Sequence, residues 1–142
     1  MTVYFAYGAN MDPVHMAEHC PGAERIGPAT LEGFRIGIGA GGFGTAREAP
    51  GRAVHGVLWR LTDRDEAALD RFEDVAGGFY RKETVAVRER DRPTASAMIY
   101  RAVDDRPGAP NEKYLARVIE VAGQLGLPAA YLAELRGLRT GG

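Results

Sequence analysis

The chain has 142 residues, of which 18 are basic, 19 are acidic and 45% are hydrophobic, and its net charge at pH 7 is −1. This balanced charge argues against nucleic acid and anionic membranes as partners. A chain of this length buries enough apolar surface to fold without disulfides or metals, so we predict a single domain over residues 1–142.

Cysteine content and hydropathy indicate the compartment. Cys20 is the single cysteine, which excludes an internal disulfide and is typical of a reducing environment. No apolar run is long enough to span a bilayer. We therefore expect a cytoplasmic protein with no membrane partner. For its oligomeric state, we expect a monomer or a homodimer.

Helices and strands are expected where hydrophobic periodicity and capping residues agree. In chain order, these elements are a strand at 3–7, a helix at 13–19, strands at 31–38 and 54–61, a helix at 63–72, strands at 80–87 and 97–103, and helices at 111–125 and 129–138. Strands outnumber helices and do not alternate regularly with them. The pattern favours the α+β class, with a mixed, partly barrel-like β-sheet flanked by short helices.

Local chemistry defines several of these elements. Asp12 is the expected N-cap of the first helix, and either Thr62 or Asp63 caps the second. Within the strand at 54–61, residues 57–59 are apolar without a polar interruption. Strands buried on both faces have this pattern, so we predict that this strand is central.

The most informative stretch is residues 4–11, with the sequence Tyr-Phe-Ala-Tyr-Gly-Ala-Asn-Met. An apolar, strand-like run stops at Gly8, Ala9 and Asn10. Glycine and asparagine accept backbone angles that most residues avoid, so we predict a sharp turn. Such a turn leaves backbone N–H groups at the end of a strand, where they hold a carboxylate or an oxyanion. The alternative is an ordinary loop that leads into a helix.

Glu73 is a candidate for a catalytic side chain. On a helical wheel, Leu69 and Phe72 define the buried face, and Glu73 lies about 70° from its centre. Asp70 and Asp74 point well away from that face. We expect the Glu73 carboxylate at the edge of the core, where the helix C-terminus raises its pKa and makes it a better base near neutral pH. The alternative is an ordinary boundary glutamate paired with a nearby arginine.

Other features are weaker candidates. The glycine-rich residues 39–44 follow a strand, but neither a helix start nor an acidic partner supports a dinucleotide site, so we interpret them as a loop near an active cleft. His15 and His19 have a spacing that can chelate zinc, yet no second ligand pair accompanies them, which favours incidental surface histidines. His55 is interpreted as a packed strand residue. Ser96 has no Gly-x-Ser-x-Gly setting, which excludes serine-nucleophile chemistry.

Four motifs, in their order and spacing, resemble those of the γ-glutamylcyclotransferase-like family. They are Tyr7-Gly8-Ala9-Asn10-Met11; Val54-His55-Gly56-Val57-Leu58-Trp59; Leu69-Asp70 through Glu73 with Tyr80; and Pro110-Asn111-Glu112-Lys113-Tyr114 followed by Gly126-Leu127-Pro128. The resemblance covers nearly the whole chain. In one departure, Ala9 stands where the family usually has serine.

The resemblance implies a reaction. In a γ-glutamyl compound the α-amino group attacks its own γ-carbonyl, closes the lactam 5-oxoproline and expels an amine. Glu73 is implied as the general base that takes the proton of the ammonium group and returns it to the leaving nitrogen. No metal or organic cofactor is implied, and a small γ-glutamyl molecule is the expected partner.

The resemblance also implies a set of substrate-binding residues. They are Tyr7, Gly8, Ala9, Asn10, Tyr80 and Tyr114. The N–H groups of the turn would bind either the α-carboxylate or the oxyanion, and the later tyrosines would contact the glutamyl group or Glu73. One alternative is a non-catalytic module that binds a small metabolite. Another is a cyclotransferase for a γ-glutamylamine or other modified substrate, whose leaving group would contact residues 39–44 and 104–110.

Overall fold

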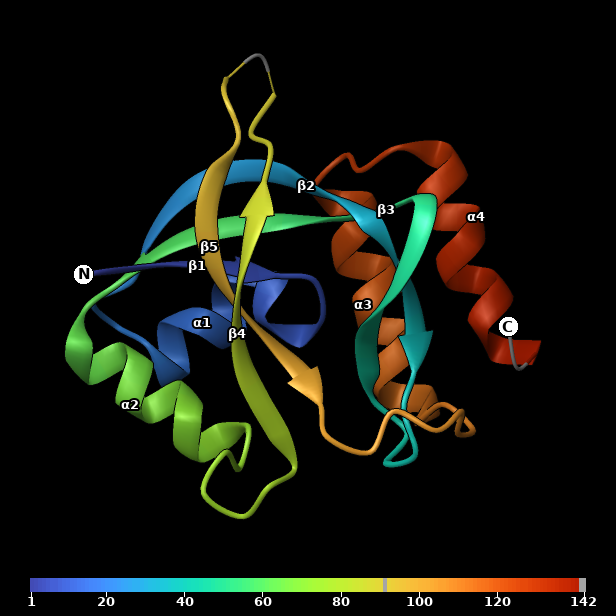
Figure 1. Ribbon diagram of the computed structural model, residues 1–142, viewed down its shortest axis with the longest axis horizontal. Coiled ribbons are helices and arrows are strands. Elements are labelled where there is room, and N and C mark those ends of the chain that lie inside the picture. Colours follow the sequence, from blue (N-terminus) through green and yellow to red (C-terminus); the bar gives the residue numbers. More distant parts are fainter. Residues whose placement is uncertain (91, 141–142) are drawn as a thin grey trace.

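The computed structural model describes residues 1–90 and 92–140, so the single domain predicted over 1–142 includes three residues outside this description. The strands are β1 (Thr2–Ala6), β2 (Glu24–Ile38), β3 (Gly44–Leu61), β4 (Tyr80–Val87) and β5 (Ala95–Ala102) (Figure 1). The helices are the 3-10 turn η1 (Ala9–Met11), α1 (Pro13–His19), α2 (Asp63–Phe72), α3 (Glu112–Gln124), α4 (Ala129–Gly137) and the 3-10 turn η2 (Leu138–Thr140).

The five strands form one mixed sheet in the order β2-β3-β1-β5-β4. β1 is antiparallel to β3 and parallel to β5, and the remaining neighbours are antiparallel. The sheet is not a closed barrel. Within the described residues, one isolated bridge joins the edge strand β2 to Arg88, directly after β4, where Thr30 and Arg88 exchange backbone hydrogen bonds of 2.8 and 2.9 Å. The predicted α+β fold with a mixed sheet is confirmed.

The hairpin of β2 and β3 is much longer than predicted, with strands of 15 and 18 residues. β2 has register shifts at Arg25/Gly27 and at Glu32/Phe34. Such irregularities interrupt the alternation of polar and apolar residues that identifies a strand in sequence. The predicted central position of 54–61 is confirmed, because β3 lies between β2 and β1.

The helices agree closely with their predicted bounds, and for α1 and α2 the N-caps were visible in the sequence. The Asp12 side chain accepts a hydrogen bond of 3.0 Å from the Val14 N–H at the start of α1. At α2 the cap is Thr62 and not Asp63. Thr62 and Asp65 form a reciprocal capping box, with hydrogen bonds of 3.1 and 3.3 Å.

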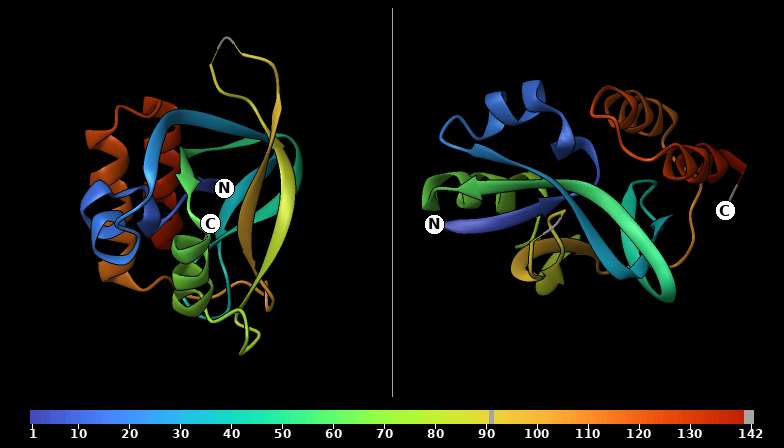
Figure 2. Two further views of the ribbon diagram at one scale, coloured as in Figure 1. Left: turned by 90° about the vertical axis from the view of Figure 1, so that its left-hand side faces the viewer. Right: turned by 90° about the horizontal axis from the view of Figure 1, so that it is seen from above.

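The elements pack in layers around the long hairpin. Seen from above, α1, α3 and α4 lie on one side of β2 and β3, while β4 and β5 lie on the other (Figure 2). Fully buried side chains from several elements, including Phe5, Leu61, Leu69, Ile99 and Leu115, share one core. No helix among the described residues has both the length and the apolar character needed to cross a membrane.

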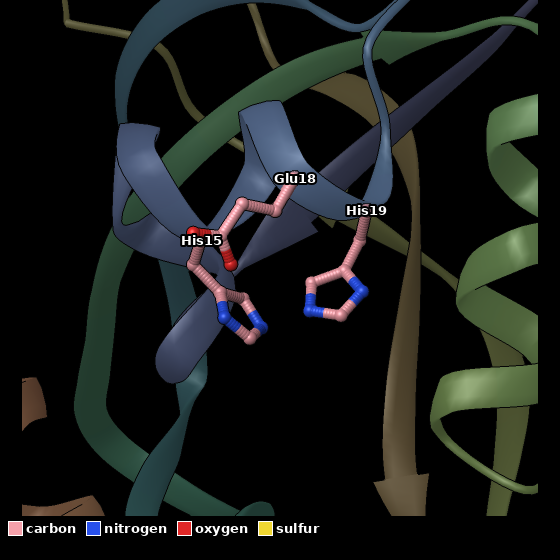
Figure 3. Close-up of side chains that lie close together, drawn as sticks. All are labelled: His15, Glu18 and His19. Atoms are coloured by element: carbon pink, nitrogen blue, oxygen red, sulfur yellow. The ribbon is translucent and has the colours of Figure 1, made fainter.

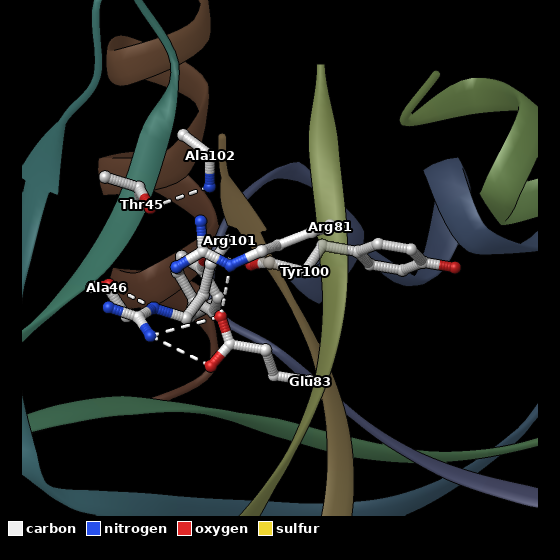
Figure 4. A network of polar contacts seen from close by, with 8 residues as sticks. Thr45, Ala46, Arg81, Glu83, Tyr100, Arg101 and Ala102 are labelled. Atoms are coloured by element: carbon white, nitrogen blue, oxygen red, sulfur yellow. Dashed lines mark hydrogen bonds and ion pairs between the residues drawn. The ribbon is translucent and has the colours of Figure 1, made fainter. Parts of the chain in front are cut away.

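A polar network joins strands that are not neighbours in the sheet (Figure 4). Arg101 on β5 donates to the Ala46 carbonyl of β3 at 2.9 Å and to both carboxylate oxygens of Glu83 on β4 at 2.9 and 3.2 Å. The Ala102 N–H donates to Thr45 Oγ1 at 3.0 Å. β3 is therefore tied to the β4–β5 pair, which carries two tyrosines of the site described next.

Candidate active site

A cavity of about 170 Å³ opens among β1, η1, the end of α2, the start of β4 and α3. It is smaller than the ~300–1,000 Å³ pockets typical of drug-sized ligands, so its size suits a small metabolite. Its lining residues are Tyr4, Tyr7, Gly8, Ala9, Asn10, Phe43, Gly44, Phe72, Glu73, Phe79, Tyr80, Tyr100 and Tyr114. All the site residues predicted from the sequence are therefore brought together in one cavity.

The predicted turn is the 3-10 turn η1 that follows β1. Its hydrogen bonds run from the Met11 N–H to the Gly8 carbonyl at 3.0 Å and from the Asp12 N–H to the Ala9 carbonyl at 3.1 Å. The N–H groups of Gly8, Ala9 and Asn10 donate no hydrogen bond within the turn, as is usual for the first residues of a helical turn. These three residues line the cavity.

Gly8 is glycine for a reason that the sequence did not reveal. Its φ is −127°, outside the left-handed region in which glycine is favoured. The hydroxyl of Tyr114 instead occupies the space that a Cβ at Gly8 would need. The same hydroxyl would lie 2.7 Å from a Cβ at Gly44. The two glycines thus allow α3 to place the Tyr114 hydroxyl against the turn.

Glu73 is the C-cap residue of α2. The helix ends in a Schellman motif, in which the Asp74 N–H bonds the Arg71 carbonyl at 3.1 Å and the Val75 N–H bonds the Asp70 carbonyl at 3.0 Å. Asp74 has a φ of +51°, the left-handed conformation that this motif requires. The chain turns away immediately after Glu73, whose half-buried side chain lines the cavity.

The surroundings of Glu73 set its protonation. Asn10 Nδ2 donates to Glu73 Oε1 at 3.3 Å and to Tyr4 Oη at 2.9 Å. Burial raises the pKa of Glu73 to about 7, and the hydrogen bond from Asn10 lowers it in part. The raised pKa was predicted, but burial is its main cause and not the helix C-terminus. Among the described residues that line the cavity, Glu73 alone carries a charged side chain.

Asp70 does not lie on the outer face of α2, so this prediction was wrong. It accepts a hydrogen bond of 2.7 Å from the Tyr100 hydroxyl and forms an ion pair of 3.1 Å with Lys82. The helical wheel identified only the apolar face of α2. The polar side chain of Asp70 lies on another face, which is covered by β4 and β5. Tyr80 likewise has a fixed partner, because its hydroxyl donates to the Gly44 carbonyl at 2.7 Å. Asp70 and Tyr80 are therefore structural supports of the cavity wall.

The tyrosines of the cavity keep their protons. Burial raises the pKa of Tyr4 and Tyr7 well above the ordinary value and that of Tyr114 to about 12. A hydrogen bond from the Gly44 backbone partly offsets the increase in the pKa of Tyr114. At neutral pH these hydroxyls are neutral hydrogen-bonding groups, which leaves Glu73 as the lining side chain that exchanges a proton.

The two loops expected near the cleft have different roles. Phe43, from residues 39–44, lines the cavity as predicted. Residues 104–110 do not line it and contact the glycine-rich turn from outside. Just after them, the Asn111 N–H donates to the Gly42 carbonyl at 2.8 Å. Residues 104–110 therefore support the loop, and Asp104 lines a neighbouring pocket that shares Phe43, Phe79 and Tyr80 with this cavity.

Sequence reasoning missed several aromatic lining residues. Tyr4 and Tyr100 lie on the paired strands β1 and β5, with ring centroids 5.6 Å apart. A tyrosine within an apolar strand needs a partner for its hydroxyl, and that signal was available. Phe72, which the helical wheel placed on the buried face, is 48% exposed, and Phe79 is 41% exposed. These rings border the cavity instead of filling the core.

The weaker candidates have structural roles. His55 is half-buried, with Nδ1 3.3 Å from Thr30 Oγ1 and its ring 4.8 Å from that of Tyr131. This is the packed strand residue predicted from the sequence. The buried thiol of Cys20 has its pKa raised to about 11, which disfavours the thiolate that a nucleophile requires.

Comparisons with known proteins agree with this architecture. Residues 53–135 match the model of the AIG2-like family. The γ-glutamylcyclotransferase of Bos taurus is 27% identical over 148 residues, covering 96% of this chain and 78% of its own. The Homo sapiens γ-glutamylcyclotransferase is 26% identical with the same coverage. A solved structure named γ-glutamyl cyclotransferase matches with a TM-score of 0.88 at 25% identity, covering 95% of this chain and 86% of the other.

The fold of the mixed sheet and its helices is therefore shared with a solved structure named γ-glutamyl cyclotransferase. The family match spans more than half of the chain, and the protein belongs to the AIG2-like family. Its relatives and structural neighbours identify it as a γ-glutamylcyclotransferase-like enzyme.

Proposed function

We propose that the protein cyclises a γ-glutamyl compound to 5-oxoproline and releases an amine or amino acid, with Glu73 as general acid and base. One observation carries this proposal. The Glu73 carboxyl, with a pKa raised to about 7, is the charged group of a mostly aromatic cavity and accepts a hydrogen bond from the Asn10 side chain of the opposite turn. The names of the bovine and human relatives supply the reaction class.

The first step prepares the nucleophile. The α-ammonium group of the substrate must lose a proton, and a carboxylate whose pKa lies near 7 accepts it efficiently at neutral pH. Asn10 Oδ1 is a buried acceptor with no hydrogen-bond partner among the described residues. It would accept a second N–H of the same group and orient its nitrogen. That nitrogen then attacks the γ-carbonyl carbon and forms the C–N bond of the lactam.

The second step expels the leaving group. Negative charge develops on the γ-oxygen, and the N–H groups of Gly8, Ala9 and Asn10 would bind either this oxyanion or the α-carboxylate. The bond to the leaving nitrogen then breaks as Glu73 gives its proton to that nitrogen. The Glu73 carboxylate takes the second proton of the ring nitrogen and passes it to the released amine or to water. Both reacting groups belong to one molecule, so the main task of the site is to hold a bent conformer. The Tyr114 hydroxyl would support the glutamyl group, and Tyr7 would form part of the wall.

The border of the cavity bears on the leaving group. Phe72 and Phe79 are exposed there, and no lysine or arginine of the described chain lines the cavity. This composition favours an uncharged or apolar leaving group, as in some γ-glutamylamines. The absence of a cofactor, the cytoplasmic location and the monomeric or dimeric state remain predictions.

Substitution of Glu73 is the direct test of this mechanism. Glu73→Gln keeps the volume of the side chain but removes the base, so we expect 5-oxoproline release to fall by about 10²–10⁴-fold. Release should be measured on a panel of γ-glutamyl amino acids and amines. Asp74→Asn is the matched control, because asparagine also accepts the left-handed conformation and the bond that Asp74 Oδ1 receives from the Gly77 N–H.

Asp70→Asn is unsuitable as a control, because Asp70 holds the hydroxyl of Tyr100. Equal turnover by Glu73→Gln and the native enzyme would rule out the mechanism. If the native protein releases no 5-oxoproline, but γ-glutamyl compounds raise its melting temperature, the non-catalytic binding module becomes the better description.

A further inference from the structure

Three side chains of α1 gather on the outside of the helix: His15, Glu18 and His19 (Figure 3). One ligand atom of each lies within 4.8 Å of those of the other two. The imidazole rings are one helical turn apart, with centroids separated by 4.4 Å. Figure 3 shows that each ring directs one nitrogen toward the other ring. Two potential donor atoms thus already face a common space.

The cluster contains an unsatisfied polar atom. His15 Nε2 is buried and has no hydrogen-bond partner among the described residues. A buried polar atom without a partner is unfavourable, so a ligand that binds there offsets a penalty already present in the fold. Glu18 is exposed, so solvent and ions reach the cluster.

The rings are held by an aromatic neighbour. The Phe72 ring lies 5.2 Å from that of His15 and 4.8 Å from that of His19, measured between centroids. α2 thereby covers one side of the histidine pair and limits the positions that the imidazoles adopt. Side chains restricted in this way lose less freedom when they bind an ion.

We propose that His15, Glu18 and His19 bind a divalent transition-metal ion of the zinc class, with water at the remaining positions. Two imidazole nitrogens and one carboxylate oxygen are ligands that such ions take, and an open position is common where three protein groups bind. With metal–ligand distances of about 2.0–2.2 Å, tetrahedral ligand atoms lie about 3.4 Å apart. Rotation of the exposed Glu18 side chain and small shifts of the half-buried imidazoles close the difference from the 4.8 Å limit.

The structure supplies what the sequence lacked. The sequence favoured incidental histidines because no second ligand pair accompanied them. Glu18 is the third ligand, three residues after His15 and next to His19, and the fold adds the covering ring of Phe72. The inference does not depend on the proposed reaction, because Glu73 takes no part in the cluster.

Calorimetric titration with Zn²⁺ alone tests the proposal on the full chain. We expect one ion per chain for the native protein and none at this site for the double variant His15→Gln, His19→Gln. The matched control is His55→Gln, which removes the remaining histidine of the chain and should bind as the native protein does. Zn²⁺ should raise the melting temperature of the native protein and of His55→Gln, but not that of the double variant.

Glu18→Gln provides a test that does not disturb packing, because this side chain is exposed. It should weaken Zn²⁺ binding by at least about tenfold, the lower end of the effect of losing a group that supports a metal site. NMR resonances of the imidazole protons should move on titration for His15 and His19 and stay in place for His55. Equal affinity of the double variant and the native protein, or no stoichiometric binding by the native protein, would overturn the proposal.

Discussion

Asn10 is the residue that connects the turn to the carboxyl group. It is 3% exposed, and its side chain donates to both Glu73 and Tyr4. Its backbone carbonyl accepts a hydrogen bond of 3.0 Å from Trp59 Nε1 on β3. The position of Asn10 is therefore fixed through its backbone, while its side chain is available to tune the acidity of Glu73.

Removal of the Asn10 side chain should change the pH profile of the enzyme. The kcat/KM of the native enzyme is expected to rise with pH through a pKa of about 7, because Glu73 must be deprotonated to act as a base. Asn10→Ala removes a hydrogen bond that favours the carboxylate, while the burial that raises its pKa largely persists. The acid limb should therefore move to higher pH.

Ala9→Ser is the matched control for this experiment. It introduces the residue usual in the family and leaves both hydrogen bonds of the Asn10 side chain intact. Its acid limb should coincide with that of the native enzyme. An unchanged limb in Asn10→Ala would show that Asn10 does not set the acidity of Glu73.

At the scale of elements, β3, β4 and β5 depend on Arg101. The Arg101 side chain is 11% exposed, pairs with Glu83 and lies over the Phe34 ring at 5.3 Å. Arg101→Ala would leave Glu83 paired with the exposed Arg81 and would remove a donor from the Ala46 carbonyl. We expect the free energy of unfolding to fall by about 2–4 kcal/mol, measured by urea denaturation.

Arg60→Ala is the comparison for Arg101→Ala. Arg60 forms an ion pair of 3.6 Å with Glu24, and both side chains are largely exposed. Exposed pairs contribute little, so the loss should stay below about 1 kcal/mol. Losses of similar size in the two variants would contradict the assigned role of the network.

The sequence predicted those elements whose bounds depend on neighbouring residues in the chain. The predicted strand at 80–87 has the bounds of β4, and the caps of α1 and α2 were visible as single residues. β2 was truncated in the prediction because its register shifts interrupt the alternation. Within the site, local pattern made Glu73 and the turn candidates, and the family resemblance made them the expected site. The partners of Asp70 and the reason for Gly8 were not, because both depend on distant tyrosines.

At the scale of the whole molecule, the acidity of Glu73 makes stability depend on pH. Between the ordinary value of 4.5 and about 7, the folded protein holds a proton on Glu73 that the unfolded chain releases. The contribution of Glu73 to stability therefore falls as pH rises through this window. Above this pH window, the ionised Glu73 carboxylate lowers the free energy of unfolding by about 1–3 kcal/mol relative to its protonated form.

The measurement is the free energy of unfolding of Glu73→Gln minus that of the native protein, followed with pH by urea denaturation. The glutamine does not titrate, so this difference should increase in favour of the variant from pH 4.5 to pH 7.5. A difference that stays constant over this range would show that folding does not raise the pKa of Glu73.

The central place of β1 in the sheet has a consequence for the order of folding. Thr2 pairs with Leu61 on one side of β1, and Tyr4 pairs with Met98 on the other. These contacts join residues far apart in the chain, and the entropy of closing such long loops must be overcome before the contacts form. The hairpins β2–β3 and β4–β5 need no such closure, so we expect them to assemble first. The turn at Gly8–Asn10 then forms late, when β1 inserts between the two hairpins. The cavity forms at this last step.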